Sequence, residues 1–130
     1  DVENYPEWNP IVKQTERLDP VDGSRVWRET DPGGGTITFR EVSADPPASR
    51  VVEVYDDEAP YEGRWDYSLV EEDGNTRLTI METGEIPNPF LRFVMRFIVG
   101  NDRFQRTYFE SIAEHFGEEN VVIEPAPAAQ

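Results

Sequence analysis

The spacing of the apolar residues changes once along this chain, at Pro87-Asn88-Pro89, and this change constrains the fold more than any other feature. Before it, apolar and polar residues alternate, which is typical of strands with one buried face. After it, the large apolar residues lie three, four or seven positions apart, which suits one face of a helix. The pattern predicts an α+β domain in which a helix covers one face of an antiparallel sheet.

Six segments before the change have strand character, and short turn-forming runs separate them. The clearest segment is 62–71, where Trp65, Tyr67 and Leu69 share one face. Asp73-Gly74-Asn75 is a hairpin turn, and the run 19–23 is read as a second turn. The predicted strands are 11–18, 25–29, 36–42, 49–55, 62–71 and 76–86.

The helix is predicted to run from Asn88 to Phe116. Asn88 is a suitable N-cap, with Pro89 at the first helical position, and Gly117 is a suitable stop. The run 100–102, Gly-Asn-Asp, either breaks this helix in two or kinks it.

The charge of the chain narrows the classes of partner. A net charge of -15, from 27 acidic and 12 basic side chains, repels phosphate backbones and anionic membranes, so nucleic acid is not expected as a partner. The most apolar run, 90–99, is about half of the ~20 residues that a membrane span needs, so stable membrane insertion is not expected either. The chain starts with Asp1-Val2-Glu3 and not with a basic, then apolar leader, so a cytoplasmic location is expected.

Residue usage limits the chemistry. The chain has no cysteine and one histidine, His115, so disulfides, thiolate chemistry and multi-histidine metal sites are excluded, and no cofactor is expected. Lys13 is the only lysine. Strong acidity with so few lysines suits a halophilic source; the alternative is an ordinary acidic protein from a genome that favours arginine.

Two stretches of the chain resemble one family. The first is 1–10, DVENYPEWNP, and the second is 83–93, TGEIPNPFLRF, which continues to Phe116-Gly117-Glu118. Together with Trp65 and Tyr67 they resemble the polyketide cyclase/dehydrase family of START-like (SRPBCC) domains. The resemblance implies a helix-grip fold over 1–118, a curved antiparallel sheet wrapped around one long C-terminal helix, with 119–130 as a frayed tail.

The family pattern starts with a strand before the first of these stretches, and this chain starts after it. The first strand of the domain is therefore expected to be missing from the sequence given. A sheet without that strand has an unpaired edge, which favours aggregation or a homodimer.

The space between sheet and helix is the predicted binding site. Large aromatic side chains on a curved sheet tend to leave a void there, although the same residues could simply fill a core. The residues expected to line it are Trp27, Phe39, Trp65, Tyr67, Leu69, Ile80, Phe93, Phe97 and Tyr108.

Glu82 is the only candidate catalytic residue. By alternation it shares a face with Leu78 and Ile80, and a carboxylate in an apolar cavity has a raised pKa and can act as a general acid or base. The alternative is that it pairs with an arginine or turns outward. Glu29 and Glu41 also share faces with aromatic neighbours, but lie near strand ends.

Arg92 and Arg96, four positions apart, could clamp a carboxylate, or could serve as solvated partners for the excess acid. The leading hypothesis for function is binding of a small hydrophobic or amphipathic molecule of lipid, polyketide or isoprenoid type. The alternatives are a cyclase or dehydratase that uses the same cavity, and a protein-interaction module on the open sheet face. The residues leave open whether the protein is an enzyme.

Overall fold

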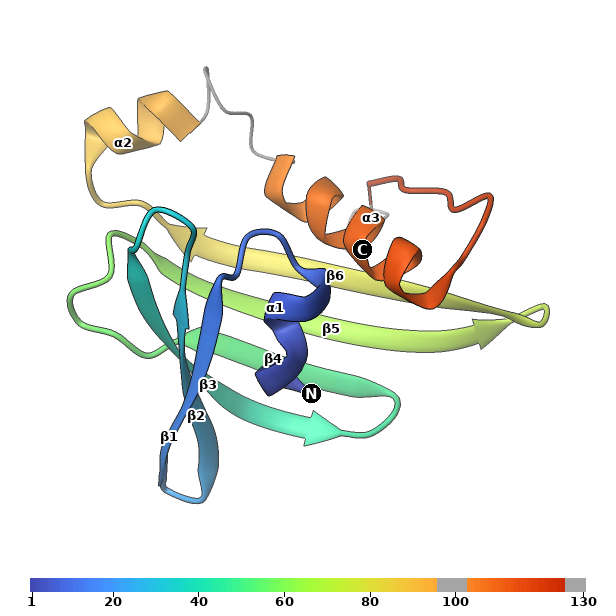
Figure 1. Cartoon of the computed structure of the whole chain (residues 1–130), viewed down its shortest axis with the longest axis horizontal. Helices are drawn as coiled ribbons and strands as arrows, with labels where there is room; N and C mark the ends of the chain where they lie inside the picture. Colours follow the sequence, from blue (N-terminus) through green and yellow to red (C-terminus); the bar gives the residue numbers. More distant parts are fainter. Residues whose placement is uncertain (96–102, 126–130) are drawn as a thin grey trace.

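The computed structural model describes residues 1–95 and 103–125 (Figure 1). It contains six strands and three α-helices, with a 3-10 helix at the start. Their bounds are η1 Val2–Asn4, α1 Tyr5–Trp8, β1 Gln14–Val21, β2 Ser24–Thr30, β3 Thr36–Asp45, β4 Ser49–Val54, β5 Glu62–Glu72, β6 Asn75–Glu85, α2 Pro89–Val94 and α3 Arg103–Phe116.

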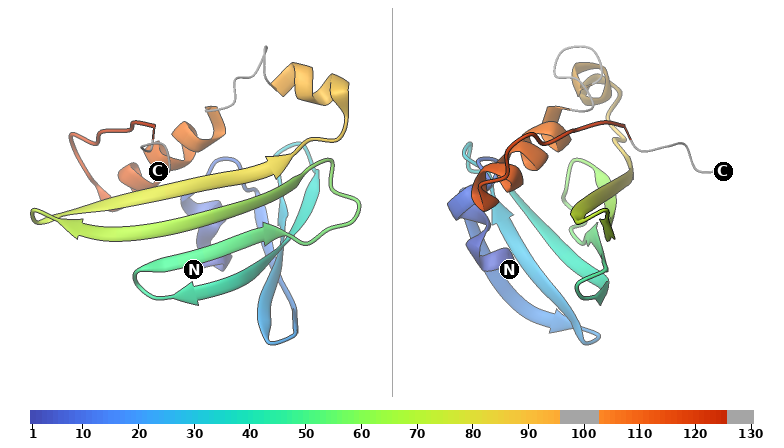
Figure 2. Two further views of the ribbon diagram at one scale, coloured as in Figure 1. Left: turned by 180° about the vertical axis from the view of Figure 1, so that it is seen from behind. Right: turned by 90° about the vertical axis from the view of Figure 1, so that its right-hand side faces the viewer.

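The strands form one sheet in the order β1-β2-β3-β4-β5-β6, and every neighbouring pair is antiparallel. The sheet is curved, and α1, α2 and α3 all lie on one side of it (Figures 1 and 2). The predicted α+β helix-grip architecture and its six strands in hairpin order are thus confirmed. β1 and β6 form the two edges of the sheet.

Two hairpins close through the same two-residue turn. Asp22-Gly23 joins β1 to β2 and Asp73-Gly74 joins β5 to β6, and all four residues have positive φ, between 50° and 78°. Asp-Gly suits this turn because its twist matches that of the flanking strands. The second turn was predicted where it lies, whereas the first is shorter than the predicted run 19–23, because β1 continues through Pro20 after an irregularity. An edge strand tolerates such a proline.

The predicted helix boundaries are confirmed at both ends. The side chain of Asn88 accepts hydrogen bonds from the backbone N–H groups of Phe90 and Leu91 at 2.9 and 3.2 Å, with Pro89 at the start of α2. α3 ends at Phe116, and Gly117 follows with a φ of 66°. The predicted break or kink at 100–102 lies outside the described residues.

The core of the described chain lies where the N-terminal helices cover the sheet. Its buried members are Val2, Tyr5, Val12, Trp27 and Val52. Trp8 of α1 also contacts α3, because its ring lies 5.6 Å from that of Tyr108 and 5.9 Å from that of His115. The N-terminal segment therefore both seals the core and supports α3 above the sheet.

The segment 119–125, after α3, has no helix or strand. The proposed domain limit at 118 stays a prediction. Among the described helices, none is long and apolar enough to cross a membrane.

Candidate functional site

The inner face of the sheet, the face toward the helices, carries a row of aromatic rings. Strand register places Trp27 opposite Phe39, and the pair Trp65 and Tyr67 two strands further on. Ring centroids are 5.9 Å apart for Trp27 and Phe39, and 5.8 Å apart for Phe39 and Trp65. Tyr67 continues the row to the helix layer, 6.3 Å from Tyr108 of α3. Most of the residues predicted to share this space are therefore brought together.

The predicted lining residues differ in burial, and this separates core from accessible surface. Trp27 is 1% exposed and belongs to the core. Phe39, Trp65, Tyr67, Ile80 and Tyr108 are partly buried. Leu69 is 41% exposed because it lies near the far end of β5, and Phe93 of α2 is 54% exposed. Phe97 lies outside the described residues.

Trp65 lies flat along its own strand. A Cβ atom at Gly63 would come within 2.6 Å of the Trp65 ring, so the absence of a side chain at 63 makes room for the indole. Glycine inside a strand commonly marks such a close approach. The local sequence of β5 thus fixes how this ring lies on the inner face.

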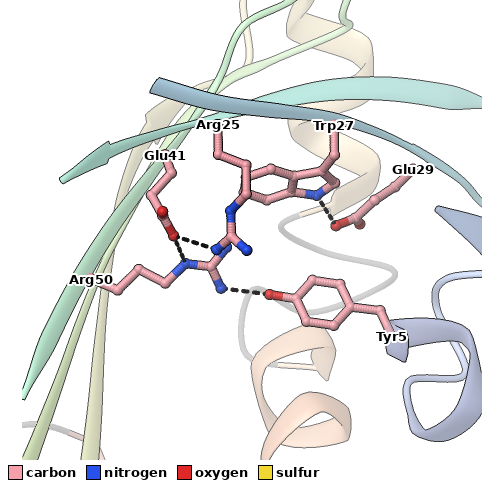
Figure 3. A network of polar contacts seen from close by, with 6 residues as sticks. All are labelled: Tyr5, Arg25, Trp27, Glu29, Glu41 and Arg50. Carbon is pink, nitrogen blue, oxygen red and sulfur yellow. Dashed lines mark hydrogen bonds and ion pairs between the residues drawn. The ribbon is translucent and has the colours of Figure 1, made fainter. Parts of the chain in front are cut away.

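A polar cluster lies in the middle of the aromatic row (Figure 3). The Glu41 carboxylate accepts hydrogen bonds from Arg50 Nε at 2.7 Å and from Arg25 Nη2 at 2.8 Å. Arg50 also donates from Nη1 to the Tyr5 hydroxyl at 2.6 Å. Its guanidinium carbon lies 5.1 Å from the centroid of Trp27 and 5.9 Å from that of Tyr67, within cation–π range.

The contacts within the cluster shift the pKa values of Glu41 and Arg50 in the directions that favour their charged forms. Burial acts to raise the pKa of Glu41, but the hydrogen bonds and charges of Arg25 and Arg50 outweigh it and leave that pKa below its usual value. Burial acts to lower the pKa of Arg50, yet Tyr5 and Glu41 raise it overall. The site therefore contains a permanent, largely desolvated guanidinium.

Three buried polar atoms on this face have no hydrogen-bond partner among the described residues. They are Thr15 Oγ1, Arg25 Nε and Arg50 Nη2. Register places Thr15 opposite Glu29 and Arg50 opposite Tyr67, so these atoms belong to the same face as the aromatic row. Buried polar groups are nearly always paired, so these three atoms retain unused hydrogen-bonding capacity on the inner face.

Glu29 lies on the other side of Trp27 from Arg50 (Figure 3). Its carboxylate accepts a hydrogen bond from Trp27 Nε1 at 2.9 Å, and burial raises its pKa. Burial, with the charges of Glu29, Glu82 and Asp31, also raises the pKa of Tyr61 to about 12. From the sequence, Glu29 was a weaker candidate than Glu82 for a buried acid/base group, because it lies near a strand end. In the structure it is partly buried beside the Trp27 indole.

Burial also raises the pKa of Tyr67 and Tyr108 above the usual value, so both hydroxyls stay protonated. They can donate hydrogen bonds at any ordinary pH. The inner face thus combines phenols that stay neutral, the paired guanidinium groups of Arg25 and Arg50, the Glu41 carboxylate with a lowered pKa, and the buried Glu29 carboxyl group with a raised pKa.

The expectation that Glu82 points into an apolar cavity needs correction. Glu82 lies opposite Trp65 on the expected face, but it is exposed and accepts a hydrogen bond from Gln105 Nε2 at 2.9 Å. β6 is an edge strand, so solvent reaches this carboxylate from the open side. Its suggested catalytic role has no support from burial.

Arg92 was expected to bind a carboxylate or to pair with acidic side chains, but its partners are backbone carbonyl groups. Its guanidinium donates to the carbonyl oxygens of Ile86 and Pro87 at 3.0 and 3.3 Å. Arg96 lies outside the described residues. No group of three or more His, Cys, Asp or Glu side chains in the described part of the chain could hold a metal ion.

Two hollows of the described chain lie away from Trp65 and Phe93, between which a pocket was expected. One, of about 660 Å³, is open and lies between α3 and the segment after it, with Arg106, Glu110 and Ile123 in its wall. The other, of about 250 Å³, lies at the β1–β2 hairpin beside Arg25. The aromatic row is therefore a partly open surface, and the proposed ligand pocket stays a prediction.

Sequence reasoning missed Arg50 and Tyr5. Arg50 alternates with Val52 in β4, so its position on the inner face could have been read from the strand pattern. Its contact with Tyr5, 45 positions away, carries no local signal.

Comparison with known proteins identifies relatives of this fold. An uncharacterized protein from Bacillus thuringiensis has 18% sequence identity and a TM-score of 0.60, over 89% of this chain and 83% of that one. The di-domain ARO/CYC StfQ from the steffimycin biosynthetic pathway has 16% identity and a TM-score of 0.57. That match covers 90% of this chain and 40% of StfQ. No curated protein matches the chain.

At these identities the two structures are similar to this chain in fold alone. The model of one protein family, described as "Polyketide cyclase / dehydrase and lipid transport", matches residues 1–109. This match covers most of the chain and agrees with the resemblance seen in its sequence. The chain belongs to the polyketide cyclase/dehydrase and lipid transport family.

Proposed function

We propose that the protein binds a small amphipathic molecule of lipid, polyketide or isoprenoid type on the inner face of its sheet. The apolar body lies on Phe39, Trp65 and Tyr67, and a polar or anionic group reaches the Arg50 guanidinium. The observation that carries this proposal is the buried Nη2 of Arg50, an unpaired donor in the middle of an aromatic row.

An unpaired buried donor costs free energy, about 1–3 kcal/mol for a typical group and more for a charged one. A carboxylate, carbonyl or hydroxyl oxygen of the ligand removes that cost when it accepts the bond. Nη2 is covered in the absence of ligand, so a ring must move aside. Tyr67 is the ring that we expect to move, because it is only partly buried whereas Trp27 is 1% exposed.

Two fluorescent probes with the same polyene chain test this arrangement: cis-parinaric acid and its methyl ester. Substitution Arg50→Met removes the cation and keeps an apolar side chain of similar length. A hydrogen bond to a charged group contributes about 1.5–3 kcal/mol, so the acid should bind roughly ten- to a hundredfold more weakly. The ester should change much less.

Arg40→Met is the matched control. Arg40 has 27% of its side chain exposed against 21% for Arg50, and each pairs with a glutamate, Glu53 and Glu41 respectively. Arg40 alternates with Phe39 and Glu41 in β3, so it lies on the opposite face. Equal losses for acid and ester, or equal losses in the two variants, would rule out a specific role of Arg50.

Catalysis by a cyclase or dehydratase is the second candidate function, and Glu29 is the observation that favours it. A carboxyl group whose pKa is raised by burial is better suited to take up and release a proton than an ordinary surface glutamate. Glu29 replaces Glu82 as the candidate acid/base group. If a polyketide-like substrate is turned over, Glu29→Gln should abolish the reaction and leave binding of cis-parinaric acid intact. Unchanged turnover in that variant would exclude this role.

A further inference from the structure

The two edges of the sheet are built differently. β1 has an irregularity between Leu18 and Val21, and it contains Pro20, which has no backbone N–H to donate. β6 pairs with β5 without interruption from Asn75 to Glu85 and contains no proline. Prolines and irregularities prevent one sheet edge from pairing with another. β1 has both of these protections, and β6 has neither.

The hairpin turn Asp73-Gly74 determines which backbone groups of β6 point outward. In a two-residue hairpin of this kind, the flanking residues Glu72 and Asn75 direct their N–H and C=O groups toward each other. Alternation then directs the N–H and C=O groups of every even-numbered residue from Thr76 to Gly84 away from β5. No other strand of the described chain pairs with β6, which lies at the edge of the sheet (Figure 1). The strand therefore offers a row of backbone donors and acceptors to a further strand.

The side chains on the outer face of β6, the face away from the helices, are complementary to themselves. In chain order they are Arg77, Thr79, Met81, Thr83 and Glu85. A cation lies at one end, an anion lies at the other, and the two threonines lie symmetrically about Met81, which is 47% exposed. In an antiparallel pair of two such strands centred on Met81, Arg77 of each copy faces Glu85 of the other. Thr79 likewise faces Thr83, and each of these contacts occurs twice.

The neighbouring registers lose the charge pairing. The outward backbone groups require even-numbered residues of one copy to face even-numbered residues of the other. If the centre moves by one residue, either Arg77 faces Thr83 or Glu85 faces Thr79. Opposite charges that face each other across two strands stabilise the pairing. The register centred on Met81 is therefore the one that the sequence of β6 favours.

We propose that β6 pairs with β6 of a second copy of this chain, in the register centred on Met81. The two sheets then form one continuous antiparallel sheet, joined by roughly eight backbone hydrogen bonds. A second copy is favoured over another protein because the strand is self-complementary under a two-fold rotation, which closes the assembly at a dimer. Arg77 bonds to Glu72 of its own copy at 2.7 Å, but its guanidinium has further N–H donors for Glu85 of the second copy. This inference goes beyond the proposed ligand site and does not depend on it.

Cysteine cross-linking tests the register, because the chain has no cysteine of its own. Met81→Cys should form a disulfide between two copies under mild oxidation, since directly opposed residues have Cα atoms about 4.5–5.5 Å apart, within disulfide range. Thr79→Cys is the matched control on the same face. Its two thiols would lie four residues apart along the strands, about 13 Å, which is too far for a disulfide. Thr79→Cys/Thr83→Cys should cross-link again, and equal cross-linking of the two single variants in non-reducing electrophoresis overturns the proposed register.

Sedimentation equilibrium tests the dimer itself. Physiological ionic strength screens charges beyond about 8 Å and so limits the repulsion between two chains of net charge -15. A cross-strand ion pair changes an equilibrium by up to about fivefold, and the interface contains it twice, so Arg77→Glu or Glu85→Arg should weaken dimerisation at least tenfold. Arg77→Glu/Glu85→Arg should restore it. Arg28→Glu, which changes an exposed, paired arginine of β2, should dimerise as the parent does.

Three results overturn the proposal. One is a parent protein that stays monomeric, as it would if another strand of the same polypeptide covered β6. Another is a dimer that persists unchanged in Arg77→Glu and Glu85→Arg, and the third is a failure of the combined variant to restore the dimer. Thermal melts followed by circular dichroism show that each variant is folded. Binding of cis-parinaric acid should persist in Arg77→Glu, which separates a failure here from a failure of the ligand site.

Discussion

Trp27 and Trp65 lie on the same face of the sheet, yet Trp27 is buried in the core and Trp65 is only partly buried, in the surface where we propose that the ligand binds. Trp27 is 1% exposed and is enclosed by Val2, Tyr5 and Val52, so Trp27→Ala leaves a closed cavity. A substitution of this kind costs about 3–5 kcal/mol of unfolding free energy. The Trp27 indole also donates to the Glu29 carboxylate, and its loss leaves that buried group without this donor.

Trp65 is only partly buried, and solvent can fill the space that it leaves. About half of the ~200 Å² that an aromatic side chain can bury, at about 25 cal/mol per Å², gives a cost of about 2.5 kcal/mol for Trp65→Ala. The same substitution removes one wall of the proposed site. Binding of cis-parinaric acid should therefore weaken at least tenfold.

Urea denaturation followed by circular dichroism measures the first effect, and titration with cis-parinaric acid measures the second. We expect Trp27→Ala to lower mainly stability and Trp65→Ala to lower mainly affinity. If Trp65→Ala costs as much stability as Trp27→Ala while the probe still binds normally, Trp65 is a core residue and the division made here is wrong.

Four further predictions concern the sheet and its charges. Gly63→Val should push the Trp65 ring from the strand and shift its fluorescence, since even a Cβ atom at 63 meets the ring at 2.6 Å; an unchanged spectrum would contradict this. Glu29→Gln should stabilise the protein at pH 7 and have little effect at low pH, because a raised pKa means that the folded state disfavours the charged form as pH rises. Glu41→Gln should instead destabilise the protein at pH 7. The lowered pKa of Glu41 stabilises the folded state above the pKa of the unfolded chain, and this stability is lost as pH falls through the folded pKa. The free energies of unfolding of the two variants, measured by denaturation across pH, must therefore diverge as pH rises. If the acidity is a halophilic adaptation, molar potassium chloride should raise the melting temperature, and a flat or falling value would count against it.

Local patterns were enough to predict the architecture. The alternation in 62–71, the Asp73-Gly74 turn and the Asn88 cap each depend on a few neighbouring residues. Such features are encoded where they occur, so they can be read without a structure.

The candidate site could be predicted only in part, because its chemistry depends on contacts between distant strands. Glu41 was expected on the inner face, but its pairing with two arginines depends on the register of β2, β3 and β4. Glu82 was a candidate for a buried carboxylate, with an outward or paired position as the alternative, and on the edge strand β6 it is exposed. Tyr5 could not be connected with Arg50 from the sequence, because the N-terminal helices pack across the sheet.

The central claim is that the inner face holds an amphipathic molecule at Arg50. Native mass spectrometry of freshly purified protein tests it most directly, with the parent compared with Arg50→Met and Arg40→Met. The account predicts that the parent and Arg40→Met carry one co-purified molecule that organic solvent extracts, and that Arg50→Met has lost most of it. The bare mass of the chain in all three, together with no saturable binding of cis-parinaric acid, would contradict the account.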